Sequence, residues 1–386
     1  MDLTFSSLFT TTFYSSVLFL CIFFMLKKAN RMRQVGVRTL ILCILLVLLK
    51  LMFPYEFFFS KNINLTLLYP KIYQFLHSPL ELFKNKTIQP FNILCFIWGA
   101  GIVYNLMIFI IQYVRMSFYV KNLELIRDQR LYDLLYSIIE KKRLHFHFRF
   151  VSSETAVSPY IFGIFRPYVV LSDTMNLDSQ NLYYIISHEI AHYYNGDLLL
   201  KFIMSLLKIV YWWNPLLYLL QKQLNRLLEI NIDSIVTRNW SENQKLNYLS
   251  CLIDSAKEKY IVPVPCKDEI ILSFQSGNPF TTSQRVTFLL EDLDAPNKFS
   301  LPRSALLLFL SVFLFFIPVF TTFEAWHAAP QIKEDTFEIN SQNAFYIDNG
   351  NGTFDLYIDY NYAKTITEIF DSTIPIKKRG SQNEIQ

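Results

Sequence analysis

The segment His188-Glu189-Ile190-Ala191-His192 combines two imidazoles and a carboxylate at a spacing that can hold a metal ion. On a helix, residues four positions apart lie one turn apart on the same face, so His188 and His192 can bind one Zn²⁺. Glu189 lies beside them, where its carboxylate can take a proton from a water molecule. The segment therefore predicts a zinc site with Glu189 as the catalytic base; a solvated or core histidine pair is the alternative.

A catalytic zinc needs a third protein ligand and one open coordination position. After Asp197 the next acidic residue is Glu229, and no histidine or cysteine lies between them. Asn214-Pro215 is a typical helix start, which places Glu229 in a helix that begins at Pro215. We expect Glu229 to be the third ligand. Asp233, one turn later on the same face, is expected to accept the second N–H of a zinc-bound imidazole.

Asp197 follows the turn that ends the histidine helix, in Tyr193-Tyr194-Asn195-Gly196-Asp197. Its carboxylate could orient His192, or it could cap the next helix. We favour the capping interpretation and keep the orienting one open.

Elements that position these residues follow from apolar periodicity and cap residues. Helices are expected over about 116–142, 178–195, 198–212, 215–238 and 241–258. The alternating run 144–150, LHFHFRF, and the apolar run 168–171 predict two strands. The segment from 115 to 303 is long enough to form one domain with its own core.

The composition of the 386-residue chain points to a membrane protein. Apolar residues make up 52% and charged residues only 18%, which argues against a disordered chain or an ordinary soluble enzyme. Five scattered cysteines without a CxxC pair argue against a disulfide framework or a cysteine-based metal site. The net charge of +4 is too small to suggest binding of nucleic acid.

Four stretches are apolar enough to cross a bilayer, at 5–26, 35–53, 90–114 and 304–323. The second carries Arg38 and Lys50 near its ends, where long side chains can reach the head groups. The loop 27–38 is rich in Lys and Arg, and basic residues also follow the third span. By the positive-inside rule this loop and residues 115–303 are cytoplasmic, whereas the N-terminus and the loop 54–90 lie outside.

The same rule places the tail 324–386 outside the cell, and this tail holds ten acidic and five basic residues. Asn349-Gly350-Asn351-Gly352 separates two short alternating runs, so a β-hairpin is expected over 344–359. The stretch 198–220 has a rival interpretation as a fifth span, but crossing would separate Glu229 from the histidines. An amphipathic or membrane-dipping helix, with its tyrosine and tryptophans near the interface, is favoured instead.

The motif HExxH, the aspartate five residues after its second histidine, Trp213-Asn214-Pro215 and the pair Glu229/Asp233 resemble the membrane metallopeptidases of the BlaR/MecR type, the β-lactam-sensing receptors. The segment with Ser158-Pro159, Gly163, Arg166-Pro167 and Val169-Val170-Leu171 resembles the strand and turn before that family's zinc helix. The resemblance covers about residues 1–323. Only 63 residues follow, so the family's penicillin-binding sensor domain is not expected. The one SxxK match, at Ser205–Lys208, lies in an apolar helix and is read as a coincidence.

Together these observations predict a multi-pass α-helical membrane protein with four spans. Residues 1–114 would form three spans, 115–303 a cytoplasmic α+β gluzincin-like zinc metalloprotease domain, 304–323 the fourth span and 324–386 a short extracellular tail. The resemblance implies a signalling peptidase with Zn²⁺ as cofactor, which cleaves a cytosolic transcriptional repressor, and itself during activation, after an antibiotic or envelope signal. It also implies a homodimer in the cell membrane.

Two alternatives remain at this stage. One is a membrane protease of general or precursor-processing duty. The other is a non-catalytic receptor or immunity protein that keeps the zinc fold for binding.

Overall fold

The computed structural model of the chain describes ten segments, with short gaps inside the fragments 148–172 and 344–378. They are 5–26, 29–55, 59–65, 68–83, 86–140, 148–172, 179–259, 279–294, 299–325 and 344–378. Two compact units are present, residues 1–325 and residues 326–386, and each is considered by itself.

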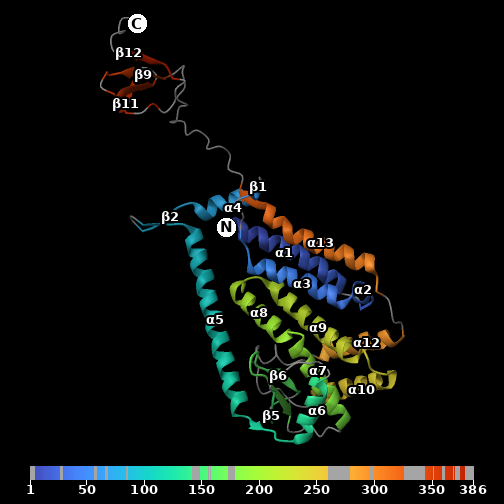
Figure 1. Cartoon of the computed structure of the whole chain (residues 1–386). Coiled ribbons are helices and arrows are strands. Elements are labelled where there is room, and N and C mark those ends of the chain that lie inside the picture. The colour runs from blue at the N-terminus through green and yellow to red at the C-terminus, as the bar shows by residue number, and fades with distance from the viewer. Residues whose placement is uncertain are drawn as a thin grey trace. The chain divides into compact units, whose positions relative to one another are not determined.

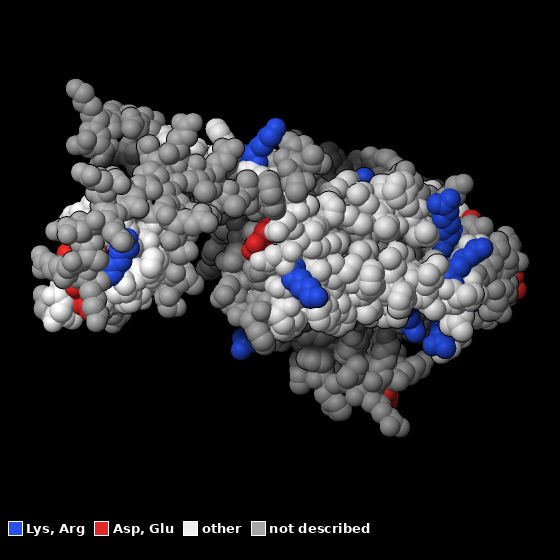
Figure 2. Space-filling view, turned by 90° about the horizontal axis from the view of Figure 1, so that it is seen from above, with Lys and Arg blue, Asp and Glu red and all other residues white. Residues whose placement is uncertain are grey.

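Three helices form a bundle in the first unit: α1 (Phe5–Leu26), α3 (Val37–Met52) and α13 (Leu301–Phe320) pack against one another (Figure 1). The short helix α2 (Ala29–Val35) joins α1 to α3 through Gly36, whose φ of 87° favours glycine. Seen from the side of α13, the bundle surface carries few charges (Figure 2). A surface of this kind suits contact with lipid.

Three of the described helices are long and apolar enough to cross a membrane, over Ser6–Leu26, Pro90–Asn122 and Leu301–Phe320. The expected span at 35–53 corresponds to α3, which has only 16 residues. At 1.5 Å per residue α3 is about 24 Å long, short of a hydrocarbon core of about 30 Å. A fourth span therefore stays a prediction.

The two ends of the bundle are each tied together by contacts between distant segments. At one end β1 (Lys61–Leu65) pairs in parallel with β8 (Thr321–Ala325), beside α4 (Leu68–His77). We call this the β1 end. At the other, the α2 end, the Ser300 amide donates to the Gln34 carbonyl at 2.7 Å. The loop 54–90 and the segment that follows α13 thus lie at the same end of the bundle.

A long helix, α5 (Pro90–Asn122), follows the hairpin of β2 (Leu80–Phe83) and β3 (Lys86–Ile88). The expected helix over 116–142 is wrong as one element. The chain leaves α5 at Leu123, whose backbone is extended, forms β4 (Glu124–Leu125) and starts α6 (Gln129–Glu140). Asp128 initiates α6 because its carboxylate accepts from the amide of Arg130 at 3.0 Å.

A four-stranded sheet in the order β4-β5-β7-β6 follows, with β5 (Arg149–Ser153), β6 (Tyr160–Phe162) and β7 (Tyr168–Ser172). The strand expected at 168–171 is confirmed. Most of the other expected strand, 144–150, lies outside the described residues, and β5 begins only at Arg149. Gly163 is required between β6 and β7, since a Cβ there would lie 2.5 Å from the Arg166 carbonyl oxygen.

The other helices among the described residues of the first unit are α7 (Ser179–Tyr194), α8 (Asp197–Val210), α9 (Pro215–Thr237), α10 (Glu242–Lys259) and α12 (Pro279–Asp294). Asn214 caps α9 by accepting from the Leu216 amide at 3.0 Å, as the Asn-Pro pair predicts. Ser241 and Gln244 form a reciprocal capping box at the start of α10.

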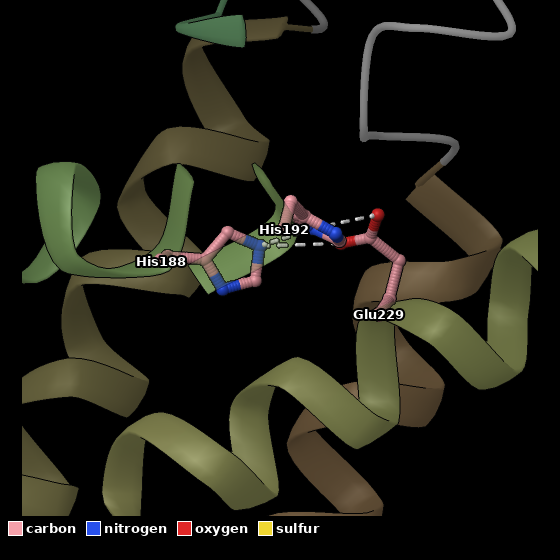
Figure 3. A group of neighbouring side chains, drawn as sticks. All are labelled: His188, His192 and Glu229. Atoms are coloured by element: carbon pink, nitrogen blue, oxygen red, sulfur yellow. Dashed lines mark hydrogen bonds and ion pairs between the residues drawn. The ribbon is translucent and has the colours of Figure 1, made fainter. Parts of the chain in front are cut away.

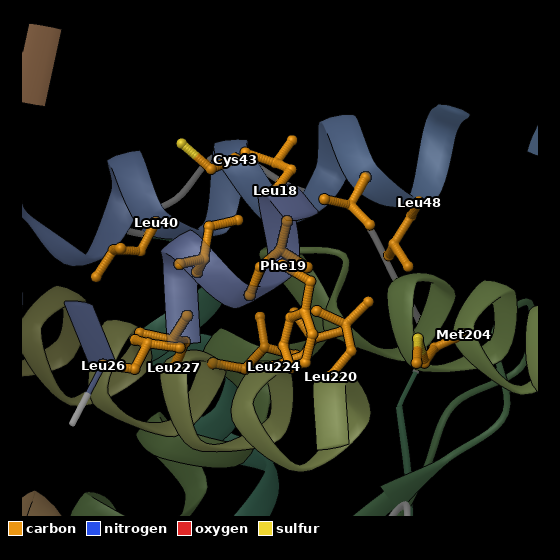
Figure 4. Close-up of a cluster of buried hydrophobic side chains, with 14 of the residues drawn as sticks. Leu18, Phe19, Leu26, Leu40, Cys43, Leu48, Met204, Leu220, Leu224 and Leu227 are labelled. Atoms are coloured by element: carbon orange, nitrogen blue, oxygen red, sulfur yellow. The ribbon is translucent and has the colours of Figure 1, made fainter. Parts of the chain in front are cut away.

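One large apolar core joins α8 and α9 to the bundle. Figure 4 shows side chains of this core from α1, α3, α8 and α9, among them Leu18, Phe19, Leu26, Leu40, Leu48, Met204, Leu220, Leu224 and Leu227. A second core joins α6 and α7 to the sheet, with Phe150, Ile186 and Ile190 fully buried. Helix α7 thus lies on the sheet, and α9 lies between α7 and the bundle.

The second unit holds a four-stranded sheet in the order β11-β10-β9-β12. The strands β9 (Ala344–Asp348) and β10 (Phe354–Ile358) pair antiparallel, which is the expected hairpin. The sheet also contains β11 (Asn361–Ile366) and β12 (Ile376–Lys378), which the sequence interpretation missed. Neither strand shows a regular alternation of apolar and polar residues, NYAKTI in β11 and IKK in β12, so the pattern does not predict them.

Candidate metal centre

Helix α7 places His188 and His192 one turn apart on the face that meets α9 (Figure 3). Both side chains are buried, and their Nε2 atoms lie 3.2 Å apart. The helix is fixed from its other face, where Ile186 and Ile190 pack into the core under the sheet. The i, i+4 spacing therefore brings two nitrogen ligands to one point, as predicted.

Glu229 reaches the same point from α9. Its Oε1 lies 3.4 Å from Nε2 of His192, and its Oε2 lies 3.4 Å from Nε2 of His188. One ligand atom from each of the three residues can be chosen so that all lie within 4.8 Å of one another. Oε2 is buried and accepts no well-aligned hydrogen bond from the described residues. Two imidazoles and a carboxylate form a donor set that fits Zn²⁺.

The Nδ1 atoms of both histidines face away from this point toward acceptors. Nδ1 of His192 lies 2.6 Å from the Asp197 carboxylate. Nδ1 of His188 lies 2.9 Å from the Tyr248 hydroxyl, which itself donates to Asp233 at 2.7 Å. With the proton on Nδ1 of both rings, the Nε2 atoms are the ones that can bind a metal. In the structure, Nη2 of Arg285 also lies 3.4 Å from Nε2 of His188.

Asp197 does not cap α8 with its side chain, so the favoured capping interpretation is wrong. The N-cap of α8 is Gly196, whose φ of 79° closes the turn after α7, and Asp197 is the first helical residue. The turn directs the Asp197 carboxylate back to His192, which makes the orienting interpretation the one that the geometry supports.

Two further residues complete the centre, and the sequence interpretation named neither. Arg285 of α12 is buried and binds both oxygens of Asp233 at 2.7 Å. Its Nη1 lies 3.1 Å from Oε2 of Glu229. Tyr248 of α10 links His188 to Asp233. Neither residue stands at a fixed spacing from the histidines, so no local signal identifies it.

Burial and neighbouring charges act against each other on the acidic residues. Burial raises the pKa of Glu189, and the nearby His188 and His192 offset only part of that increase. Burial also disfavours the charged forms of Glu229 and Asp233, but neighbouring groups outweigh it: His192 and Arg285 for Glu229, and Arg285 and His188 for Asp233. The pKa values of Glu229 and Asp233 therefore fall below their usual range. Glu189 is thus the acidic residue of the three suited to hold a proton.

Burial opposes protonation of His192, but the facing Glu229 and the hydrogen bond to Asp197 raise its pKa to about 9. Without a bound cation, the centre would therefore keep a proton on His192 at neutral pH. A metal must displace that proton to bind.

Comparison with known proteins identifies the family. Residues 6–289, about three quarters of the chain, match the peptidase family described as BlaR1 peptidase M56. The chain belongs to this family. The predicted resemblance is thereby confirmed, and the centre on α7 and α9 lies within the matched residues of this M56 peptidase.

Named relatives of this M56 peptidase include regulatory and resistance proteins. The regulatory protein BlaR1 of Bacillus licheniformis is 29% identical over 153 residues, which cover 39% of this chain and 26% of that protein. BlaR1 of Staphylococcus aureus is 26% identical over 170 residues, which cover 43% of this chain and 27% of that protein. The methicillin resistance mecR1 protein of Staphylococcus aureus is 24% identical over 236 residues, 57% of this chain and 37% of that protein. The M56 peptidase thus matches about a quarter to two fifths of these relatives.

Proposed function

We propose that this M56 peptidase is a zinc endopeptidase that acts in transmembrane signalling and cleaves a cytosolic transcriptional repressor. The convergence of His188, His192 and Glu229, with Glu189 next to His188 on α7, carries the proposal. Its relatives are a regulatory protein and a methicillin resistance protein, which supports a role in a response to antibiotics.

His188, His192 and Glu229 would hold the ion, which as a Lewis acid lowers the pKa of a water and polarises a peptide carbonyl. Glu189 takes the proton of the attacking water and passes it to the leaving amine. Its raised pKa suits this transfer. Asp197, Tyr248 and Asp233 keep the imidazoles in the orientation and tautomer that ligation needs.

The proposed cytoplasmic location of the metal centre rests on the distribution of basic residues along the chain. Basic residues are concentrated between α1 and α3, at the α2 end of the bundle. Arg226 of α9, one turn before Glu229, bonds the carbonyl of Leu26 at that same end. If the α2 end is cytoplasmic by the positive-inside rule, the metal centre faces the cytoplasm and a soluble repressor can reach it.

The proposal is tested with Glu189→Gln, which removes the base but no ligand. We expect purified full-length Glu189→Gln protein to keep wild-type zinc content by mass spectrometry. Cells that express it should lack protein fragments that wild-type cells produce under antibiotic or envelope stress, as detected by sequencing of new N-termini. The control is Glu242→Gln, an exposed glutamate in the first turn of α10, which should behave as wild type.

Fragments that persist in Glu189→Gln cells would overturn the catalytic role. If cleavage is lost but the fragments come from many envelope precursors and no repressor, the protease has a general processing duty. A Glu189→Gln strain with a full wild-type response would indicate a non-catalytic receptor.

A further inference from the structure

The hairpin of α8 and α9 reaches far along the bundle. At its tip the Tyr211 hydroxyl donates to the carbonyl of Leu51 at 2.9 Å. Leu51 is the last residue but one of α3, at the β1 end. Asn214 and Leu216 lie across a small cavity from Thr12, in the first half of α1. The tip thus lies beside the halves of α1 and α3 that are remote from the metal centre.

The tip is also held by α5. The Trp98 indole donates to the Val210 carbonyl at 2.8 Å, and the Trp212 indole donates to the Trp98 carbonyl at 3.3 Å. A Cβ on Gly101 would lie 2.4 Å from the Trp212 ring, so only a glycine permits this approach. Trp98 lies in the part of α5 that is long and apolar enough to cross a membrane.

The base of the hairpin lies at the α2 end. Arg226 donates to the carbonyl of Leu26, the last residue of α1, at 3.2 Å. Asn214 and Arg226 are twelve residues apart on α9, which corresponds to about 18 Å along the helix. If α1 crosses the membrane, the hairpin enters from the α2 end and penetrates more than half of a core of about 30 Å.

The outer surface of the hairpin is apolar over the part of this depth nearest the tip, and Lys222 is the first exposed polar residue toward the base. From Gly196 to Gln221 every exposed residue is apolar or aromatic: Leu199, Leu206, Trp213, Pro215, Tyr218 and Leu219. Exposed polar residues, Asn195 and Lys222, stand directly outside this range. By contrast the exposed side chains that the structure describes on α10 are mostly polar, with Leu246 and Ile253 as exceptions. A surface of this composition is suited to acyl chains rather than to water.

The two lysines of α8 do not oppose a lipid environment. Lys201 is buried within the protein, on the side of Glu189 and His192, whose charges it influences. The ammonium of Lys208 lies over the ring of Tyr218, 4.7 Å from its centroid, which lowers the free energy of removing it from water. Lys222 is close enough to the base for its long side chain to reach the head groups.

We propose that α8 and α9 form a re-entrant membrane hairpin, inserted among lipid acyl chains from the side of the metal centre. It is neither a fifth span, because both of its ends lie at the α2 end, nor a helix lying flat on the membrane. The hairpin fixes the height of the metal centre at the membrane boundary. His192 bonds to the first residue of α8, and Glu229 follows Arg226 by one turn of α9.

The test uses single-cysteine variants of the full-length chain, with the native cysteines replaced by alanine, spin-labelled in phosphatidylethanolamine/phosphatidylglycerol vesicles. The labelled positions are Leu206→Cys and Leu219→Cys on the hairpin. Leu246→Cys on α10 is a control of matched exposure, 46% against 38% and 43%. Phe309→Cys on α13 serves as the lipid reference. Collision with oxygen reports lipid, and collision with a water-soluble nickel chelate reports water.

We expect the ratio of oxygen to nickel collision rates at 206 and 219 to match that at 309 and to exceed the ratio at 246 several-fold. A ratio at either hairpin position that equals the value at 246 would overturn the proposal. Each variant is first shown to unfold at the temperature of the cysteine-free parent, so that a water-exposed label cannot be ascribed to misfolding. The readout does not depend on proteolysis and therefore stands apart from the proposed function.

Discussion

Replacement of Arg285 by methionine tests whether the buried charges of the metal centre depend on one guanidinium. Arg285 is 6% exposed, and its partner Asp233 is 0% exposed, with two nitrogen–oxygen distances of 2.7 Å. Methionine fills a similar volume but leaves the Asp233 carboxylate buried without a counter-charge. Removal of one partner of such a pair costs about 3–5 kcal/mol. At about 2–4 °C per kcal/mol, the value for domains of 150–250 residues, the unfolding midpoint of this larger unit should fall by up to roughly 6–20 °C.

The measurement is thermal unfolding of the full-length protein in detergent, followed by tryptophan fluorescence in the presence of a chelator. Arg130→Met is the matched control. Arg130 also binds an aspartate, Asp128, through two nitrogens, but it is exposed on α6, so its loss should not move the midpoint measurably. The double variant Arg285→Met/Asp233→Asn should recover part of the lost stability, because the unpaired charge is gone. If Arg285→Met unfolds at the wild-type temperature, the ion pair does not stabilise the centre and the reasoning fails.

Three further predictions follow from the same contacts. In chelated protein, the stability contributed by His192 is fully present below pH 6.5 and is lost as the pH rises through about 9, on the order of 3 kcal/mol; unfolding midpoints that stay constant from pH 6 to 9.5 would contradict this. Asp197→Asn should weaken zinc binding about 10- to 100-fold, because Nδ1 of His192 loses its carboxylate acceptor. Competition with a zinc-binding dye measures the affinity, and a wild-type affinity would refute the prediction. Gly101→Ala should destabilise the protein by about 1–3 kcal/mol because Trp212 must move. Gly99→Ala should not destabilise it, since nothing lies within 4 Å of the added carbon. Equal unfolding midpoints of the two variants would refute the close contact between Gly101 and Trp212.

Helix geometry and capping rules predicted that His188, His192 and Glu229 come together, because both rules depend only on neighbouring residues. The i, i+4 spacing of His188 and His192 and the start of α9 at Asn214 depend only on helix geometry and capping, and both hold in the structure. Arg285 could not be predicted, because it reaches Asp233 from 52 residues along the chain. Its role is set by tertiary packing, which the composition around it does not reveal.

The depth of the α8–α9 hairpin could not be predicted from the sequence either, because it too is set by contacts between distant segments. Its apolar composition allows a span, a surface helix or a re-entrant hairpin. Only the contacts of Tyr211 with Leu51 and of Arg226 with Leu26 distinguish among them. For Asp197, capping and orienting use the same carboxylate, and the αL conformation of Gly196 decides between them.

The parallel pairing of β1 with β8 has a consequence for biosynthesis. Lys61 pairs with Thr321, 260 residues later in the chain. At a synthesis rate of about 5–20 residues per second, β8 is synthesised about 13–52 seconds after β1, and β1 is unpaired during that time. Its sequence, Lys-Asn-Ile-Asn-Leu, is largely polar and so protects an unpaired edge from aggregation during that interval. The pairing can form only once α13 has been made, so it marks completion of the bundle.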